Sequence, residues 1–275
     1  EKTGTKRLYV PARYIDNPVL MNNDPLYEKR LENISDIGLR NALKNGDWDI
    51  VAGGAIDDVW RTNVHVIRPF KLNKKIPVFR TFDWGCSKPF SCGWWAVMNG
   101  EECSNGKIYP AGTLIRVAEL YGCGNIPNTG LYLDDTEIGK RIKEKDKYVR
   151  TVLDCYTYAG AADTQIFDYR AGGSISDMIN KGFGGTCFIR ANKTAGSRIT
   201  GLQLLRQRLS NAIKGEGEAL YIFDTCTDFI RTVPVLPRVK INTDDVDTNA
   251  EDHIYDETRY MLLANYKKND IIEIE

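Results

Sequence analysis

The chain has 275 residues, of which 42% are hydrophobic and 10% aromatic, so it can bury a sizeable core and is not globally disordered. Its 37 basic and 37 acidic side chains balance, which excludes a uniformly basic nucleic-acid-binding surface. No run of about 18 apolar residues and no signal-peptide pattern occurs, so we expect a soluble, intracellular protein.

The first part of the chain carries turn signals and little apolar periodicity. Asp16-Asn17-Pro18 and Asn23-Asp24-Pro25 predict turns. Helical patterns follow over 26–34 and 36–45, the second ended by Gly46. This stretch has too little apolar material for a core of its own.

From residue 76 the pattern changes to β-branched and aromatic runs separated by Gly, Pro and Asn. Three strands are predicted, over 78–83, 92–98 and 113–121, and they favour an antiparallel meander. After residue 134 helices and strands alternate. The predicted helices cover 134–145, 174–180, 201–212, a segment after Thr225, and 250–265, and the predicted strands cover 148–154, 187–189 and 219–223. This order is typical of an α/β domain with a mixed sheet.

The seven cysteines are an odd number and form no CxxC pair. Neither a disulfide framework nor a zinc site is indicated, and we expect reduced, mostly buried thiols. The first residue is Glu1 rather than methionine, so we also expect a fragment or a processed piece of a longer protein.

Two stretches have strongly one-sided charge. Between Asp177 and Glu216 there is no acidic residue, and this stretch is a candidate phosphate-facing patch, with a solvated helix face as the alternative. Its basic residues are Lys181, Arg190, Lys193, Arg198, Arg206, Arg208 and Lys214. Residues 244–257 invert the balance, with seven acidic residues and no Lys or Arg. Such a cluster of negative charges favours the binding of a cation.

Asp83 ends the predicted strand 78–83, and Trp84-Gly85 turns the chain directly after it. Strand alternation places Asp83 on the same face as Phe79 and Thr81, so an otherwise apolar face ends in a carboxylate. An aspartate that caps its own turn is the structural alternative.

The acidic stretch contains a second candidate. Thr248-Asn249-Ala250-Glu251 fits a capping box, which predicts that the last helix begins there. Asp252 and Asp256 then lie one turn apart, and His253 reaches the same edge. Asp256 is the stronger candidate, because the helix N-terminus already stabilises Asp252. Like charges at this spacing need a divalent cation or an arginine such as Arg259. The opposite, packed face is predicted from Ile254, Thr258, Met261 and Leu262.

A third acid is chosen among Asp154, Asp163 and Asp168. Asp163 follows a run of small residues, 159–162, that would let a backbone or ligand approach closely, and it is the preferred choice. Asp154 is the alternative because it ends the predicted strand 148–154. Carboxylates from three separate segments form the ligand set of a two-metal site, so we propose Asp83, Asp163 and Asp256 for that role.

In these motifs the chain resembles the large terminase subunits of tailed bacteriophages. The nuclease half of that family is matched by Phe82-Asp83-Trp84-Gly85, Lys88-Pro89-Phe90, Trp94-Trp95-Ala96, Ala162-Asp163 and the run from Glu251 to Tyr260. The end of its packaging ATPase is matched by Val10-Pro11-Ala12, Asp16-Asn17-Pro18 and Gly46-Asp47-Trp48-Asp49. The resemblance implies an ATPase-domain tail and linker over 1–68 and an RNase H-like nuclease domain over 69–275.

The resemblance also implies an activity. Asp83, Asp163 and Asp256 would bind two Mg²⁺ or Mn²⁺ ions, with Asp252 and His253 as accessory metal ligands. The implied reaction is endonucleolytic cleavage of concatemeric double-stranded viral DNA during genome packaging. The implied partners are that DNA, the portal protein and the small terminase subunit, in the host cytoplasm and transiently at the procapsid portal.

The chain departs from the full-length family in one respect. No G-x-x-x-x-G-K-[ST] motif occurs, since Gly106-Lys107 precedes Ile108 and Gly139-Lys140 precedes Arg141. We therefore expect no ATPase activity from this piece.

Two other functions remain open. Another RNase H-like phosphotransferase, such as a transposase, integrase or junction resolvase, would share the same acidic geometry. A DNA- or portal-docking module without strong catalysis would carry the same acids as solvated side chains.

Overall fold

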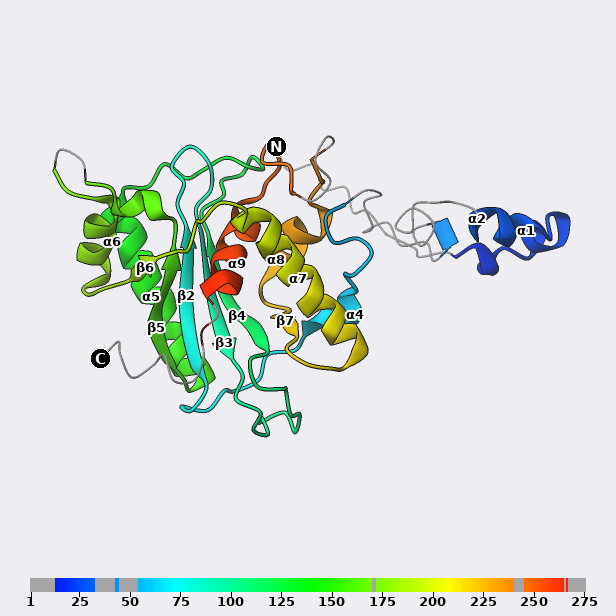
Figure 1. Ribbon diagram of the computed structural model, residues 1–275, viewed down its shortest axis with the longest axis horizontal. Helices are drawn as coiled ribbons and strands as arrows, with labels where there is room; N and C mark the ends of the chain where they lie inside the picture. Colours follow the sequence, from blue (N-terminus) through cyan, green and yellow to red (C-terminus); the bar gives the residue numbers. More distant parts are fainter. Residues whose placement is uncertain are drawn as a thin grey trace, which may run out of the picture.

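The computed structural model describes residues 13–32, 43–44, 54–169, 172–239, 245–264 and 266. Within these residues seven strands form one sheet in the order β1-β7-β4-β3-β2-β5-β6 (Figure 1). The strands are β1 (Val66–Ile67), β2 (Pro77–Asp83), β3 (Ser91–Val97), β4 (Leu114–Tyr121), β5 (Tyr156–Ala162), β6 (Phe188–Arg190) and β7 (Leu220–Phe223). Strands β2, β3 and β4 are antiparallel neighbours, and the other pairings are parallel. The predicted mixed sheet with a meander is confirmed.

Helices connect the strands after the meander, as predicted. The helices of the whole sheet-bearing part are α4 (Thr62–His65), α5 (Asp135–Leu153), α6 (Ile175–Phe183), α7 (Ser197–Lys214), α8 (Thr227–Thr232) and α9 (His253–Ala264), with the short 3-10 helices η2 (Thr164–Phe167) and η3 (Val233–Val235). No described helix is long and apolar enough to cross a membrane.

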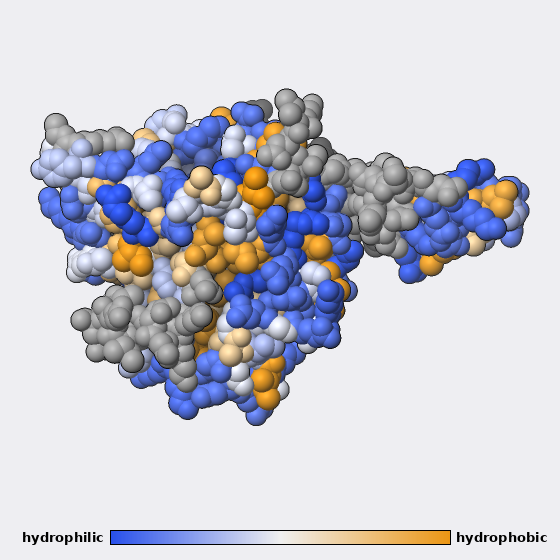
Figure 2. All heavy atoms as spheres, in the orientation of Figure 1, coloured by the Kyte–Doolittle hydropathy of each residue, from blue (hydrophilic) through white to orange (hydrophobic). Residues whose placement is uncertain are grey.

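Helices cover both faces of the sheet. Consecutive residues of β2 point to opposite faces, and Arg80 contacts Asp146 of α5 while Thr81 contacts Glu257 of α9. Helix α6 packs on α5, and α7 packs on α9, so α5 and α6 form one outer layer and α7 and α9 the other. Figure 2 shows hydrophilic residues over most of the α7 side, with hydrophobic residues gathered around α9.

Two predicted boundaries near candidate residues are wrong. The predicted strand 148–154 is the C-terminal part of α5, whose buried residues Ile138, Ile142, Val149 and Leu153 keep a helical spacing despite the β-favouring side chains between them. Asp154 is therefore the left-handed C-cap of a helix, with φ 52° and ψ 56°. The predicted capping box does not start α9, which begins at His253.

The N-terminal part of the chain has two separate regions within the described residues. Helices α1 (Pro18–Asn23) and α2 (Tyr27–Glu32), with η1 (Tyr14–Asp16) before them, lie apart from the sheet in Figure 1. Residues 54–67 instead join the sheet through β1, and His65 lies buried with Nε2 2.9 Å from the carbonyl oxygen of Leu209. The boundary at 68/69 stays a prediction.

Some predicted features lie outside the described residues. They are the motifs at 10–12 and 46–49 and most of the predicted helix 36–45. All seven cysteines are described, and they are free thiols, with Cys92, Cys103, Cys155, Cys187 and Cys226 buried. The prediction of mostly buried thiols is confirmed.

Candidate metal centre

Asp83 and Asp163 lie side by side at the carboxyl edge of the sheet. Strands β2 and β5 are parallel neighbours in which Phe82 pairs with Ala162, and the backbone N–H of Asp163 donates to the carbonyl oxygen of Phe82 at 3.0 Å. Gly160 permits this close pairing, because a Cβ there would meet the carbonyl oxygen of Arg80. The run of small residues thus serves the approach of two strands, and it brings the two aspartates together.

Asp256 reaches the same edge from the first turn of α9. The charges of Asp256 and Asp163 both act on Asp83, which is 6% exposed. Burial raises the pKa of Asp83 to about 6, and repulsion from Asp256 and Asp163 adds to that rise, while His253 opposes it. The charges of Asp163 and Asp256 therefore both act on the buried carboxylate of Asp83.

His253 and Tyr260, both on α9, hold Asp83 in place. The Nδ1 atom of His253 lies 3.4 Å from Asp83 Oδ2, and the Tyr260 hydroxyl donates to Asp83 Oδ1 at 3.2 Å. The other ring nitrogen of His253 lies 3.1 Å from Oδ1 of Asn128. Burial disfavours the imidazolium, but the hydrogen bond to Asp83 and the surrounding carboxylates raise the pKa of His253. His253 thus lies next to the buried carboxylate of Asp83.

Asp252 directly precedes α9 and is 6% exposed. Burial raises its pKa to about 7, and repulsion from Asp256 contributes to the rise. We call Asp83, Asp163, Asp252, His253 and Asp256 together the acidic site.

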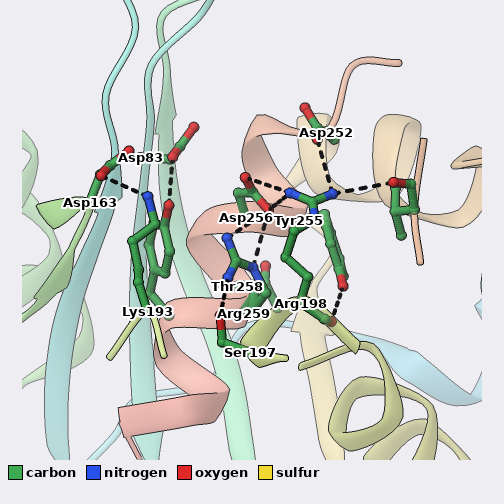
Figure 3. Close-up of polar contacts among 12 residues, drawn as sticks. Asp83, Asp163, Lys193, Ser197, Arg198, Asp252, Tyr255, Asp256, Thr258 and Arg259 are labelled. Carbon is green, nitrogen blue, oxygen red and sulfur yellow. Dashed lines mark hydrogen bonds and ion pairs between the residues drawn. The ribbon is translucent and has the colours of Figure 1, made fainter. Parts of the chain in front are cut away.

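Basic side chains already contact the acidic site (Figure 3). Lys193 Nζ lies 2.8 Å from Asp163 Oδ1. Arg198 Nη1 and Arg259 Nη2 lie 3.2 Å and 3.1 Å from Asp256 Oδ1. Arg198 also bonds Asp245 at 3.1 Å and lies 3.7 Å from Asp252. The arginine anticipated from the sequence, Arg259, is therefore present, but it acts together with a second arginine and a lysine.

The donor chemistry of the acidic site fits hard divalent cations, because carboxylate oxygens dominate it. In the described part of the chain, no three His, Cys, Asp or Glu side chains are already grouped in a way that could hold a metal ion. The carboxylates instead face ammonium and guanidinium groups. Metal binding would thus require some of these contacts to change.

A buried network fixes the helix that carries the site. Glu257, adjacent to Asp256, is 0% exposed and accepts hydrogen bonds from Trp95 Nε1 at 2.7 Å, Thr81 Oγ1 and Arg116 Nη1. Gly93 leaves room for this carboxylate, since a Cβ there would meet both Glu257 and Arg116. The packed face predicted from Ile254, Thr258, Met261 and Leu262 is buried as expected.

The seven basic residues between Asp177 and Glu216 do not form one surface. Lys193 and Arg198 contact the acidic site, Arg206 pairs with Asp58, and Arg208 pairs with Glu218. Arg190 donates to the carbonyl oxygens of Thr164 and Phe167. Lys181 on α6 and Lys214 at the end of α7 are exposed. Their DNA-binding role stays a prediction.

Sequence reasoning missed Asn128 and Tyr260 as parts of the site, and it did not foresee that Lys193 and Arg198 contact its carboxylates. Asn128 lies 125 residues before His253, and its only local signal is an asparagine followed by Thr-Gly, which suits its left-handed φ of 57°. Tyr260 lies one turn after Asp256 on α9, so its position on that helix was available from the spacing.

No protein-family model and no curated protein matches the chain. Several solved structures do match it. The large terminase of a thermophilic bacteriophage aligns over 86% of this chain and 51% of its own, with 17% identity and a TM-score of 0.52. The nuclease domain of the P22 large terminase aligns over 80% of this chain and 97% of its own, with 14% identity and a TM-score of 0.52.

These structural neighbours establish the fold. The chain has the RNase H-like α/β fold of terminase nuclease domains, as the sequence resemblance implied. It spans about half the length of the large terminase from the thermophilic bacteriophage.

Proposed function

We propose that this chain is a divalent-metal-dependent endonuclease that hydrolyses phosphodiester bonds of double-stranded DNA during viral genome packaging. The observation that supports the proposal is that Asp83 and Asp163 follow neighbouring parallel strands and that Asp256, in the first turn of α9, acts electrostatically on Asp83. This arrangement occurs in a fold shared with the P22 terminase nuclease domain. Carboxylates from separate elements at one sheet edge suit the binding of cations that clamp a phosphate.

Asp83, Asp163 and Asp256 would hold Mg²⁺ or Mn²⁺, with Asp252 and His253 as accessory groups. When bound, two such ions would activate water and stabilise the leaving oxygen. The chain's own residues supply the positions. Tyr260 and His253 orient the two oxygens of Asp83, and Glu257 anchors α9 so that Asp256 stays at the sheet edge.

The packaging context belongs to the same proposal. The substrate would be concatemeric double-stranded DNA, and the partners would be the portal protein and the small terminase subunit, in the host cytoplasm and at the procapsid portal. The ATP-hydrolysing function would lie outside this chain, which has no Walker-type phosphate loop in its sequence.

A docking module is the second candidate, and one observation favours it. Lys193, Arg198 and Arg259 already balance carboxylates of the acidic site, as they would if these acids were purely structural. Another RNase H-like phosphotransferase remains the third candidate, because the fold alone does not distinguish among such enzymes.

Cleavage of supercoiled plasmid tests the proposal. The purified chain is incubated with EDTA, Mg²⁺ or Mn²⁺, beside Asp83→Asn and Asp256→Asn. Asp154→Asn is the matched control, because it makes the same chemical change at the opposite end of β5. Asp154 is the C-cap of α5, before β5 begins, whereas the proposed ligand Asp163 follows the end of β5. We expect metal-dependent nicking and linearisation by the parent and the control, and a loss on the order of 100-fold or more in both site variants.

Circular dichroism would verify that the variants are folded. If the parent cuts under no condition, or if both site variants cut as well as the parent, the nuclease proposal fails and the docking module replaces it.

A further inference from the structure

The basic side chains at the acidic site differ in how firmly they are held. Arg259 is 2% exposed and bonds both Asp256 and the hydroxyl of Ser197. Arg198 bonds Asp245 and Asp256 and donates to the carbonyl oxygen of Val246. Each guanidinium therefore joins several chain segments, so its departure from the site would break several contacts at once.

Lys193 is held much more lightly. Its side chain is about as exposed as that of Arg198, 28% against 27%, but its ammonium contacts the single carboxylate of Asp163 and lies over the ring of Tyr260, 5.4 Å from the centroid. A lysine has a flexible four-carbon stem, whereas arginine offers a planar fork that bonds several acceptors together. Figure 3 shows the lysine aimed at Asp163 beside Asp83 and away from the arginines.

The segment that carries Lys193 is a short connection, residues 191–196, between β6 and α7. It ends at Gly196, whose φ of 82° turns the chain into the helix. Lys193 can thus change its partner by rotating its own side chain, without moving the strand or the helix.

Asp163 Oδ1 is fully engaged in this arrangement. It accepts from Lys193 Nζ at 2.8 Å and from the backbone N–H of Gln165 at 2.9 Å. A cation that binds this oxygen must take the place of the ammonium, and a cation on the neighbouring oxygen must still approach a resident positive charge.

We propose that Lys193 is an exchangeable counter-cation: it neutralises Asp163 in the metal-free protein and yields this carboxylate to a divalent ion. This inference rests on the proposed metal-dependent function and deepens it. Lys193 is a positioning residue in this scheme, and it lowers the affinity of the acidic site for metal. The released ammonium, on the solvent side, is then available to pair with a phosphate of bound DNA.

Isothermal titration calorimetry of the full chain with Mn²⁺ alone tests the inference without DNA and without cleavage. Lys193→Met keeps the length of the side chain and removes its charge, and we expect Mn²⁺ to bind on the order of fivefold more tightly. Lys193→Arg keeps the charge and offers the planar fork, so it should bind Mn²⁺ no more tightly than the parent does. Lys181→Met is the matched control, because it makes the same charge change on exposed α6 and should leave Mn²⁺ affinity unchanged.

A double-variant comparison links the effect to Asp163. If Lys193 acts at this carboxylate, its replacement should no longer tighten Mn²⁺ binding in an Asp163→Asn background. Thermal unfolding adds a second readout. Without metal, Lys193→Met should have a lower melting temperature than the parent. Added Mn²⁺ should raise the melting temperature of Lys193→Met by more than it raises that of the parent.

The outcomes separate the two proposals. If the parent binds no Mn²⁺, the proposed function fails and takes this inference with it. If the parent binds Mn²⁺ and Lys193→Met binds no more tightly, only the inference fails. Equal tightening by Lys181→Met, or persistence of the effect in Asp163→Asn, would also overturn it.

Discussion

Asp256 and Glu257 are consecutive residues of α9, and their surroundings are opposite. Glu257 faces the centre of the sheet, is 0% exposed, and is surrounded by donors from β2, β3 and β4. Asp256 faces the sheet edge, keeps 18% of its side chain exposed, and lies near Asp83 and Asp252. One helix therefore carries Glu257, which the fold surrounds with donors from three strands, and Asp256, which lies near like charges and is paired with Arg198 and Arg259.

The difference separates structural acids from candidate functional ones. A buried carboxylate surrounded by donors keeps its charge because its partners are built into the fold. At the acidic site the carboxylates repel one another, and burial and that repulsion raise the pKa values of Asp83 and Asp252 to about 6 and about 7. A site that retains such repulsion is poised to accept a cation.

The largest expected effect on stability comes from removing the carboxylate of Glu257. Glu257→Ala would leave Arg116 buried with its main counter-charge gone, and we expect a loss of about 3–5 kcal/mol in the free energy of unfolding. Arg116 is 0% exposed, so water cannot replace the lost partner. Urea denaturation measures the change, with Glu144→Ala on the exposed face of α5 as the control. A loss no greater than that of the control would remove the contrast between the two acids.

The pH dependence of stability is the next effect in size. In the metal-free protein the folded-state pKa of Asp83 is about 6, above its ordinary value of 3.8, so the folded state binds this proton more tightly than the unfolded state does. Stability contributed by the protonated carboxyl is therefore lost as pH rises from about 4 to about 6. Asp252 acts in the same direction, with a pKa of about 7. The raised pKa of His253 also adds stability below about pH 6.5 that is lost as pH rises further.

Urea denaturation between about pH 4 and about pH 8 checks this sign. We expect the free energy of unfolding of the metal-free parent to fall by about 2–3 kcal/mol over that range, because a rise of about two pKa units corresponds to about that much. Asp83→Asn should flatten the fall, and Asp224→Asn, at an exposed position after β7, should not. Stability that rises with pH would show that the acidic site is as well compensated as Glu257.

The parts of the molecule that sequence reasoning found are those with local signals. The meander follows from β-branched and aromatic runs, and the strand-end position of Asp83 follows from the turn at Trp84-Gly85. The buried face of α9 follows from its helical spacing. Residues 148–154 misled because Tyr148, Val149 and Val152 favour strands locally, while the tertiary burial of Val149 and Leu153 keeps them in α5.

The contacts that sequence reasoning could not find are long-range. The pairing of β2 with β5 brings Asp83 and Asp163 together from distant parts of the chain, and only the sheet order reveals it. The basic stretch looked like one surface because its residues are close in sequence. In the fold, Arg206 and Arg208 point to separate acids, and Lys193 turns to Asp163.

The smallest expected effect concerns the contact between Asn128 and His253. Asn128→Gly removes the side chain 3.1 Å from His253 Nε2 and keeps the left-handed backbone, where φ is 57°. One hydrogen bond of this kind is worth about 1 kcal/mol, so we expect Mn²⁺-dependent cleavage to fall about fivefold and the free energy of unfolding to fall by about 1 kcal/mol or less. Tyr132→Gly is the matched control, because Tyr132 lies in the same loop with φ 53° and is 67% exposed. If both variants lose cleavage equally, the loop rather than the contact with His253 matters. If only Asn128→Gly does, the acidic site depends on single replaceable contacts, whereas Glu257 depends on several that act together.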